Sequence, residues 1–128
     1  MLVTRRSILA LLATPFAWAS ASVRGKLLAG AKLLAAEGRE VSLTGDSSTL
    51  SVVNDLRLKD SDLEAAGEFL SPAEFKIGPI HQRNLFVHKG GQRCTISYWC
   101  AVCSIRTYTP GPCMCCQEET ALDLRATI

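Results

Sequence analysis

The sequence of 128 residues lacks the features that assign a chain to several common classes of protein. Its apolar run near the N-terminus is well under ~18 residues and contains Pro15, which is short for a helix that crosses a membrane. It has no Gly-rich dinucleotide motif, no nucleophile elbow and no paired-His metal motif. These absences argue against a membrane anchor and favour a protein that is not an enzyme.

A clustered excess of basic residues is also lacking. The chain has fourteen Lys and Arg residues against twelve Asp and Glu residues, and two of the basic ones, Arg5 and Arg6, lie in an N-terminal segment that we expect to be removed. The remaining charges balance, and Lys and Arg are scattered among acids. A surface that binds phosphates should be basic along one face. We therefore expect no nucleic-acid partner.

The N-terminal segment has the three parts of a secretory signal peptide. Arg5 and Arg6 form the basic end, residues 7–16 are almost wholly apolar, and the small residues of Ala17–Ala21 offer two overlapping cleavage sites. We place cleavage after Ala21. The sequence therefore predicts export to the periplasm or the extracellular space, with no membrane span after cleavage.

The export route is indicated by Thr4–Leu9, which resembles the bacterial twin-arginine motif. Ile8 stands where Phe is usual and Ala10 where Lys is frequent, so the general secretory route stays open. The partner predicted from this segment is the export translocase. A twin-arginine substrate folds in the cytoplasm, where thiols stay reduced and metal is available, and this favours a metal site over disulfides.

The rest of the chain suits one domain. We expect a small β-rich domain over residues 22–93 and a Cys-rich ribbon, continuous with it, over residues 94–128. The Leu and Ala content of residues 22–38 favours a helix, with a strand over Val23–Leu28 as the alternative. Strands are expected around Val41–Leu43 and Leu50–Val52, with a turn between them.

Two further helix starts and one hairpin are predicted from local signals. Ser61–Glu64 matches a capping box, and Ser71–Glu74 repeats it with Pro at the first helical position. The clearest element is a hairpin of Leu85–Lys89 and Gln92–Trp99 joined by two glycines. Together the pattern predicts a mainly β fold, a small barrel or curled antiparallel sheet with one or two short helices.

Residues 23–125 resemble a group of small exported bacterial proteins of unassigned function, in which a compact barrel-like domain precedes a cysteine tail. The residues that carry the resemblance are Val23–Leu27, Leu85–Val87, Tyr98–Cys103 and Cys113–Thr120. The resemblance implies a five-stranded barrel of the oligonucleotide/oligosaccharide-binding (OB) type. It implies no activity.

All six cysteines lie near the C-terminus. Four of them form two C-x-x-C pairs separated by nine residues, a spacing that presents four thiolates to one tetrahedral ion as in a zinc ribbon. Zinc suits four soft sulfur ligands and needs no redox function. The predicted ligands are Cys100, Cys103, Cys113 and Cys116. Neither pair is followed by the glycine that usually tightens such a turn.

Alternatives to zinc remain at this cluster. Cys94 and Cys115 are left over and can form a disulfide, replace a ligand or extend a soft-metal cluster. Iron–sulfur chemistry and Cu(I) both accept such thiolates. A disulfide framework is the plain reading of six cysteines in an exported domain. Cys115 and Cys116 themselves cannot bond without strain, because adjacent Cα atoms are about 3.8 Å apart.

A redox role has its own motif. Trp99–Cys103 resembles the W-C-x-x-C of thioredoxin-like proteins, with Cys100 as the attacking and Cys103 as the resolving thiol. The following residues make a poor helix, which argues against the resemblance, although Arg106 offers a charge for a thiolate. The first functional hypothesis is an exported, non-enzymatic module for binding or assembly whose ribbon is held by zinc. The second is a thiol or metal-centre redox protein of the cell envelope.

The remaining candidates are polar residues away from the main motif. His81 and His88 are expected to be ordinary surface or strand residues, with His88 exposed beside the hairpin turn. Carboxylates near the cluster are expected to be solvated or paired with arginine rather than to act as an acid–base pair. These are Glu118, Glu119 and Asp123, with Arg93, Arg106 and Arg125 as partners.

Overall fold

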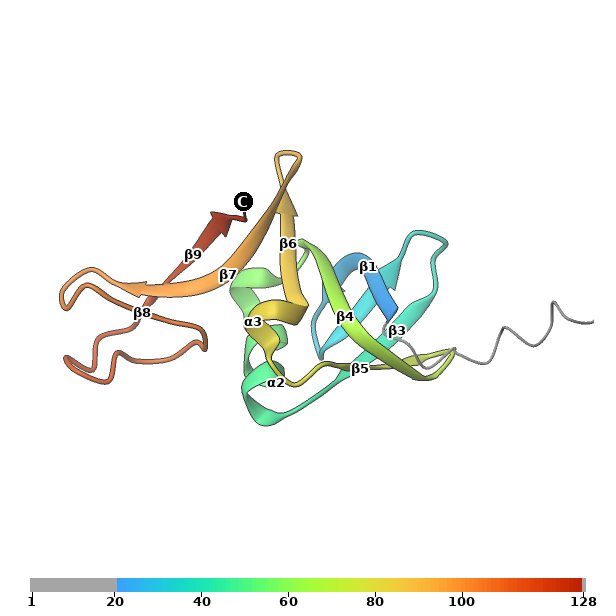
Figure 1. Cartoon of the computed structure of the whole chain (residues 1–128), viewed down its shortest axis with the longest axis horizontal. Coiled ribbons are helices and arrows are strands. Elements are labelled where there is room, and N and C mark those ends of the chain that lie inside the picture. Colours follow the sequence, from blue (N-terminus) through green and yellow to red (C-terminus); the bar gives the residue numbers. More distant parts are fainter. Residues whose placement is uncertain (1–20, 128) are drawn as a thin grey trace, which may run out of the picture.

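The computed structural model describes residues 21–127, and its centre is a closed barrel of five strands (Figure 1). The strands run in the order β1-β2-β3-β5-β4, and β4 pairs with β1 to close the ring. All neighbours are antiparallel except β3 and β5. This is the mainly β, OB-like barrel predicted from the sequence. Its strands are β1 (Ala21–Leu28), β2 (Lys32–Ala35), β3 (Glu40–Thr44), β4 (Asp62–Ser71) and β5 (Glu74–Ile77).

The first two strands replace the helix favoured for residues 22–38. β1 and β2 form a hairpin in which Gly25 lies opposite Ala35. A Cβ atom at Gly25 would collide with the backbone carbonyl of Leu34, so the close approach of the strands requires glycine there. Leu27 and Leu33 point into the core. The alternative strand over Val23–Leu28 is therefore confirmed, because burial in the barrel outweighs helix propensity.

Helix α2 (Ser47–Val53) stands where a strand around Leu50–Val52 was expected, so that prediction is wrong. The Asp46 side chain caps it by accepting a hydrogen bond from the Thr49 amide at 2.9 Å. Val52 and Val53 are buried against the barrel, and a 3-10 turn, η2 (Leu56–Leu58), follows. The turn cluster before Leu50 is in fact a helix start.

β4 also overturns a helix prediction. Leu63 and Ala65 are fully buried on alternate positions of the strand, although Ser61–Glu64 matches a capping box. β4 pairs with β1 along one edge and with β6 and β5 along the other, so its strand partners decide its conformation. The second expected helix, at Ser71–Glu74, is the turn between β4 and β5. The two short helices of the described residues are α2 and α3 (His81–Asn84).

The predicted hairpin is confirmed as β6 (Leu85–Lys89) and β7 (Gln92–Cys100). Gly90 and Gly91 both have positive φ, at 61° and 80°, as a primed turn requires. β6 pairs with β4 and thereby joins the hairpin to the barrel. Tyr98 of β7 is fully buried in the common core.

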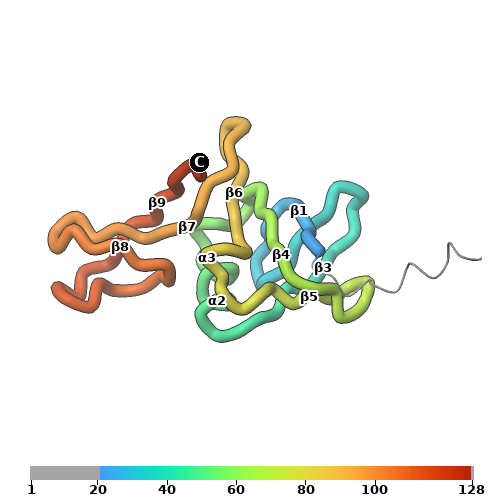
Figure 2. Tube along the Cα trace, in the orientation of Figure 1, coloured from blue at the N-terminus to red at the C-terminus, as the bar shows by residue number. Residues whose placement is uncertain are grey.

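β7 continues beyond the barrel into an arm, which we define as residues 92–127 (Figures 1 and 2). β7 pairs with β8 (Ile105–Thr107) through its last three residues and with β9 (Ala121–Ala126) through residues 94–99. The loops at the far end form the tip, residues 100–120, which carries five of the six cysteines. Because β7 crosses residue 94, the Cys-rich segment is continuous with the β-rich domain.

Residues 1–20, with Arg5 and Arg6, lie outside the described part of the chain, so the signal peptide stays a prediction. Within residues 21–127 no helix is long and apolar enough to cross a membrane.

Candidate metal centre

The tip brings together the four cysteines that the sequence singles out. The Sγ atoms of Cys100, Cys103, Cys113 and Cys116 all lie within 4.8 Å of one another, and the sulfur atoms of Cys100 and Cys116 are 3.5 Å apart. Zn–S bonds of about 2.3 Å in a tetrahedron place sulfur atoms about 3.8 Å apart. The donor set therefore fits one tetrahedral ion, and these four residues can hold a metal.

The two C-x-x-C turns share one backbone construction. The amide of Ser104 donates to the carbonyl of Cys100 at 2.8 Å, and the amide of Gln117 donates to the carbonyl of Cys113 at 2.9 Å. Ser104 and Gln117 each follow the second cysteine of a pair, and their φ angles are 55° and 66°. These left-handed residues stand where glycine is usual, so the turns adopt the glycine conformation without glycine.

Backbone amides also point at sulfur in both turns. The amide of Cys103 donates to Cys100 Sγ at 3.4 Å, and the amide of Cys115 donates to Cys113 Sγ at 3.4 Å. The amides of Cys116 and Cys115 lower the pKa of Cys113 to about 7. The second turn is thus already arranged around a thiolate, which is the form that binds metal.

Burial divides the centre into two sides. Cys100 and Cys113 are buried, whereas Cys103 and Cys116 are partly open to solvent. Neighbouring thiols raise the pKa of Cys103, that of Cys115 most strongly. Such packed thiols disfavour further ionisation unless a cation compensates the negative charge.

The second turn is closed by hydrogen bonds of its own loop. The Cys113 amide donates to the carbonyl of Glu118 at 2.7 Å, and the hydroxyl of buried Thr120 donates to the carbonyl of Gly111 at 2.8 Å. Pro112 and Glu119 form an isolated antiparallel bridge. These contacts make a small closed loop that presents Cys113 and Cys116 to the first pair.

One polar network ties this loop to the barrel. Arg57 of η2 donates from Nη1 to the carbonyl of Thr120 at 2.8 Å, and its Nη2 lies 3.0 Å from Asp55 Oδ2. The Tyr98 hydroxyl donates to the same carboxylate at 2.9 Å. Burial alone would raise the pKa of Asp55, but hydrogen bonds from Arg57 and Tyr98 hold that pKa below its usual value. The ionised carboxylate of Asp55 therefore holds Arg57, which in turn binds the tip at Thr120.

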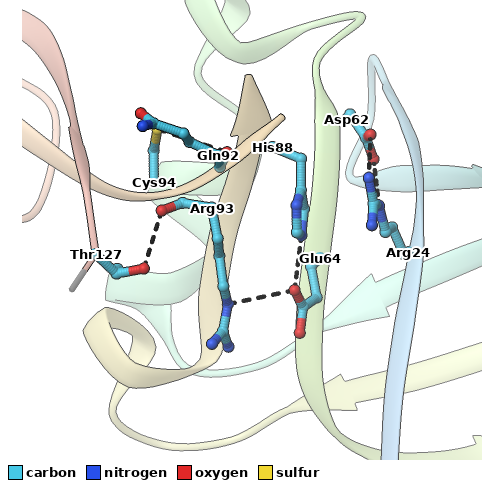
Figure 3. Close-up of polar contacts among 8 residues, drawn as sticks. All are labelled: Arg24, Asp62, Glu64, His88, Gln92, Arg93, Cys94 and Thr127. Atoms are coloured by element: carbon cyan, nitrogen blue, oxygen red, sulfur yellow. Dashed lines mark hydrogen bonds and ion pairs between the residues drawn. The ribbon is translucent and has the colours of Figure 1, made fainter. Parts of the chain in front are cut away.

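The two remaining cysteines lie in different surroundings. Cys94 is buried within β7, and its thiol points to the carbonyl of Gln92 at 3.9 Å (Figure 3). It is not part of the thiol group at the tip, so the alternatives that used Cys94 as a ligand or as the disulfide partner of Cys115 are not supported. Cys115 is exposed beside the four thiols.

Neither histidine belongs to the cluster. His88 is half-buried and its Nε2 lies 2.8 Å from Glu64 Oε1, which Arg93 also approaches at 3.4 Å (Figure 3). The expectation that His88 is exposed is therefore wrong, because β4 supplies a partner for it. His81 is buried, and its Nε2 lies 2.7 Å from the carbonyl oxygen of Tyr108.

The carboxylates near the cluster are either exposed or paired with arginine. Glu118 and Glu119 are exposed, whereas Asp123 pairs with Arg106 at 2.8 Å and with Arg125 at 3.7 Å. Arginine pairing is confirmed for Asp123.

Two features of the thioredoxin-like motif, a charge for the thiolate and a following helix, are not found beside Cys100 and Cys103. Arg106 binds Asp123 and packs over the ring of Trp99 at 4.9 Å, so its charge is engaged away from the thiols. Cys103 is followed by a turn and β8 rather than by a helix.

No protein-family model, no curated protein and no solved structure matches the chain.

Proposed function

We propose that this protein is an exported, non-enzymatic module in which Cys100, Cys103, Cys113 and Cys116 hold one zinc ion, and that this ion fixes the tip for binding or assembly. The observation that carries the proposal is the pair of matching turns. Two C-x-x-C segments with the same amide-to-carbonyl hydrogen bond converge on one group of four thiols.

Zinc is favoured by the donor set and by the surroundings. Four thiolates in tetrahedral array suit a borderline-soft ion without redox demands. Four protein thiolates would fill a tetrahedral shell, which is the composition of closed, structural zinc sites. The zinc would hold the two turns together, and the barrel would supply the surface from which they project.

The experiment is metal analysis of protein purified without chelators, together with a count of free thiols under native conditions. We expect one zinc per chain and no disulfide among residues 100–116. Protein that contains no metal and whose cysteines are fully oxidised would contradict the proposal.

The alternative is a redox protein of the cell envelope, with an iron–sulfur or copper centre at the same thiols or a Cys100–Cys103 dithiol. The partial exposure of Cys103 and Cys116 supports the metal-centre form of this alternative, whereas Cys100, the thiol that a disulfide substrate would have to reach, is buried. Visible absorbance of the fresh protein separates iron from zinc. A reduction potential below about −300 mV for a Cys100–Cys103 disulfide would mark that pair as structural.

Export is the second part of the proposal and is tested separately. It is supported by the signal-peptide pattern of residues 1–21 and by the resemblance to small exported bacterial proteins. We expect the exported protein to begin at Ser22 when its N-terminus is sequenced. Retention of Arg5→Lys/Arg6→Lys protein in the cytoplasm would assign the twin-arginine translocase as its partner, whereas normal export would assign the general route.

A further inference from the structure

A polar pocket of about 340 Å³ lies beside β7 in the arm, and none of the four thiols of the centre lines it. It lies where β7, β8 and β9 pair into one sheet, and alternate residues of β7 point to its face. Two arginines and three hydroxyl-bearing residues line it. They are Thr95, Ser97, Arg106, Tyr108 and Arg125.

The Arg106 guanidinium is held in place by three neighbours. Its Nη1 donates to the Ser97 hydroxyl at 2.7 Å and to Asp123 Oδ2 at 2.8 Å, and its Cζ lies 4.9 Å from the centre of the Trp99 ring. Ser97 is 1% exposed, and its own proton goes to the carbonyl of Asp123 at 2.8 Å. Within residues 21–127, Nε and Nη2 of Arg106 have no hydrogen-bond acceptor. An arginine fixed at one nitrogen and free at the others is preorganised to bind an anion.

Other donors of the pocket are also free of acceptors in the described part of the chain. Arg125 Nη1 lies 3.7 Å from Asp123 Oδ2, beyond hydrogen-bond distance, and the hydroxyls of Thr95 and Tyr108 form no hydrogen bond there. The backbone of Tyr108 is nevertheless fixed, because Nε2 of buried His81 lies 2.7 Å from its carbonyl oxygen. The pocket therefore gathers unused donors on a framework that is already ordered.

The balance of charge at the pocket indicates the class of ligand. Arg106 and Arg125 share the single carboxylate of Asp123, which leaves one positive charge in excess. A monoanion neutralises that excess, whereas a phosphate carries about −1.5 to −2 at neutral pH. The fork of a guanidinium also matches the two oxygens of a carboxylate in one plane.

We propose that this pocket binds a carboxylate group, presented either by a small organic acid or by a protein chain. Arg106 and Arg125 supply the charge, and the hydroxyls of Thr95 and Tyr108 supply further hydrogen bonds. The inference goes beyond the proposed function, because no residue of the pocket is a thiol of the metal centre.

Trp99 provides a reporter for the first test. In the chain from Ser22 onward it is the only tryptophan, and Arg106 lies over its ring. The mature chain, with its metal as purified, is titrated with sodium acetate that replaces chloride at constant ionic strength. We expect a saturable change in Trp99 emission and in the amide NMR shifts of residues 95, 106 and 125. A titration without saturable change in either signal would overturn the inference.

The second test uses variants that spare the fold. Arg125→Gln removes a charged donor whose side chain is 61% exposed, and acetate affinity should fall about tenfold. Tyr108→Phe keeps the ring and should lower it about threefold. Arg24→Gln is the matched control, because Arg24 is an exposed arginine outside the pocket, and it should change affinity less than about twofold. Equal losses in Arg24→Gln and Arg125→Gln would reveal general charge attraction and overturn the site.

Further probes distinguish the two sources of the carboxylate. They are benzoate, acetyl-tetra-alanine with a free C-terminal carboxylate, and the same peptide as its C-terminal amide. Tighter binding of the free-acid peptide than of acetate or benzoate, lost in the amide, supports a protein chain as the ligand. Tighter binding of benzoate than of the peptide supports a small organic acid. Inorganic phosphate that binds more tightly than every carboxylate would overturn the assigned class of ligand.

Discussion

The barrel and the tip differ in how much apolar surface each of them buries. The barrel buries complete apolar side chains on alternate strand positions, among them Leu33, Val41 and Leu63. The tip, residues 100–120, has only three buried residues, which are Cys100, Cys113 and Thr120. Its most exposed apolar side chains are those of Val102, at 73%, and Met114, at 86%.

The proposed metal centre would explain why the cysteines are concentrated at the tip. A segment that buries so little apolar surface cannot offset the entropy lost when its chain is ordered. A metal bound to four thiolates supplies that free energy in small domains that lack a core. The barrel has a core and needs no such support.

The strongest way to separate the two regions is to remove the metal. Structural zinc sites contribute about 10–16 kcal/mol of apparent binding free energy, and Cys113→Ser or a chelator should abolish that contribution. We expect amides of residues 101–120 to lose hydrogen-exchange protection, while those of β1 and β4 keep it. Cys94→Ser, which removes a thiol outside the centre, is the control. Loss of protection throughout the barrel after metal removal would show that the two regions are not independent.

A substitution in the barrel core should weaken the barrel and leave the tip intact. Leu63→Ala removes a fully buried side chain from β4 and should lower the free energy of unfolding by about 2–5 kcal/mol. Zinc affinity measured at a temperature where the barrel stays folded should be unchanged. Leu70→Ala on the exposed end of the same strand should cost much less, and equal effects of the two variants would contradict the burial seen at Leu63.

The link between the regions is tested at Arg57. Arg57→Ala removes the donor to the Thr120 carbonyl and leaves Asp55, whose side chain is 7% exposed, with one partner fewer. We expect a loss of about 1–3 kcal/mol in the free energy of unfolding and greater mobility of the Cys113 loop in NMR relaxation. Arg24→Ala is the control, because Arg24 pairs with Asp62 on an exposed surface (Figure 3) and should cost less than about 1 kcal/mol.

Acid should weaken the network of Asp55 and Arg57 that binds the tip. Because the folded state lowers the pKa of Asp55, this carboxylate stabilises the fold above its unfolded pKa of about 3.9, and its contribution disappears as the pH falls through the folded value. The difference in unfolding free energy between wild type and Asp55→Asn should therefore shrink between pH 6 and about pH 3. Urea unfolding at several pH values measures it. A difference that grows toward low pH would contradict the direction of the pKa shift.

The smallest expected effect concerns the two left-handed residues. Ser104→Gly and Gln117→Gly should each stabilise the metal-bound tip by up to about 1 kcal/mol, because glycine adopts positive φ without strain. Competitive zinc titration measures the gain. Val102→Gly, in the same turn as Ser104, is the control and should bring no gain. Equal behaviour of all three variants would show that the backbone of these turns is unstrained.

Local signals in the sequence predicted some elements and failed at others. The Gly90–Gly91 hairpin and the grouping of four cysteines follow from residues close in the chain. The capping box at Ser61 failed because the conformation of β4 depends on pairing with β1 and β6, which are distant in sequence. The Leu50–Val52 segment failed because two or three apolar residues fit a helix as well as a strand.

The support of the candidate centre was harder to foresee than its ligands. Arg57 reaches Thr120 across 63 positions of sequence, and no local pattern indicates such a contact. The absence of glycine after each cysteine pair suggested an imperfect ribbon. In the structure Ser104 and Gln117 take the left-handed conformation without being glycine. The lack of glycine at these two positions was therefore no guide to the backbone conformation of the turns.

The uninterrupted course of β7 has a consequence for the order in which the site assembles. Its last residue, Cys100, is held by a strand anchored in the core through Tyr98, and Cys103 follows within one turn. Half of the donor set is therefore in place once the barrel has folded. Capture of the ion then requires closing only the nine residues between Cys103 and Cys113, a loop of small entropic cost. With a metal at these thiols, as proposed, its uptake would be a late, short-range step of folding that follows formation of the barrel.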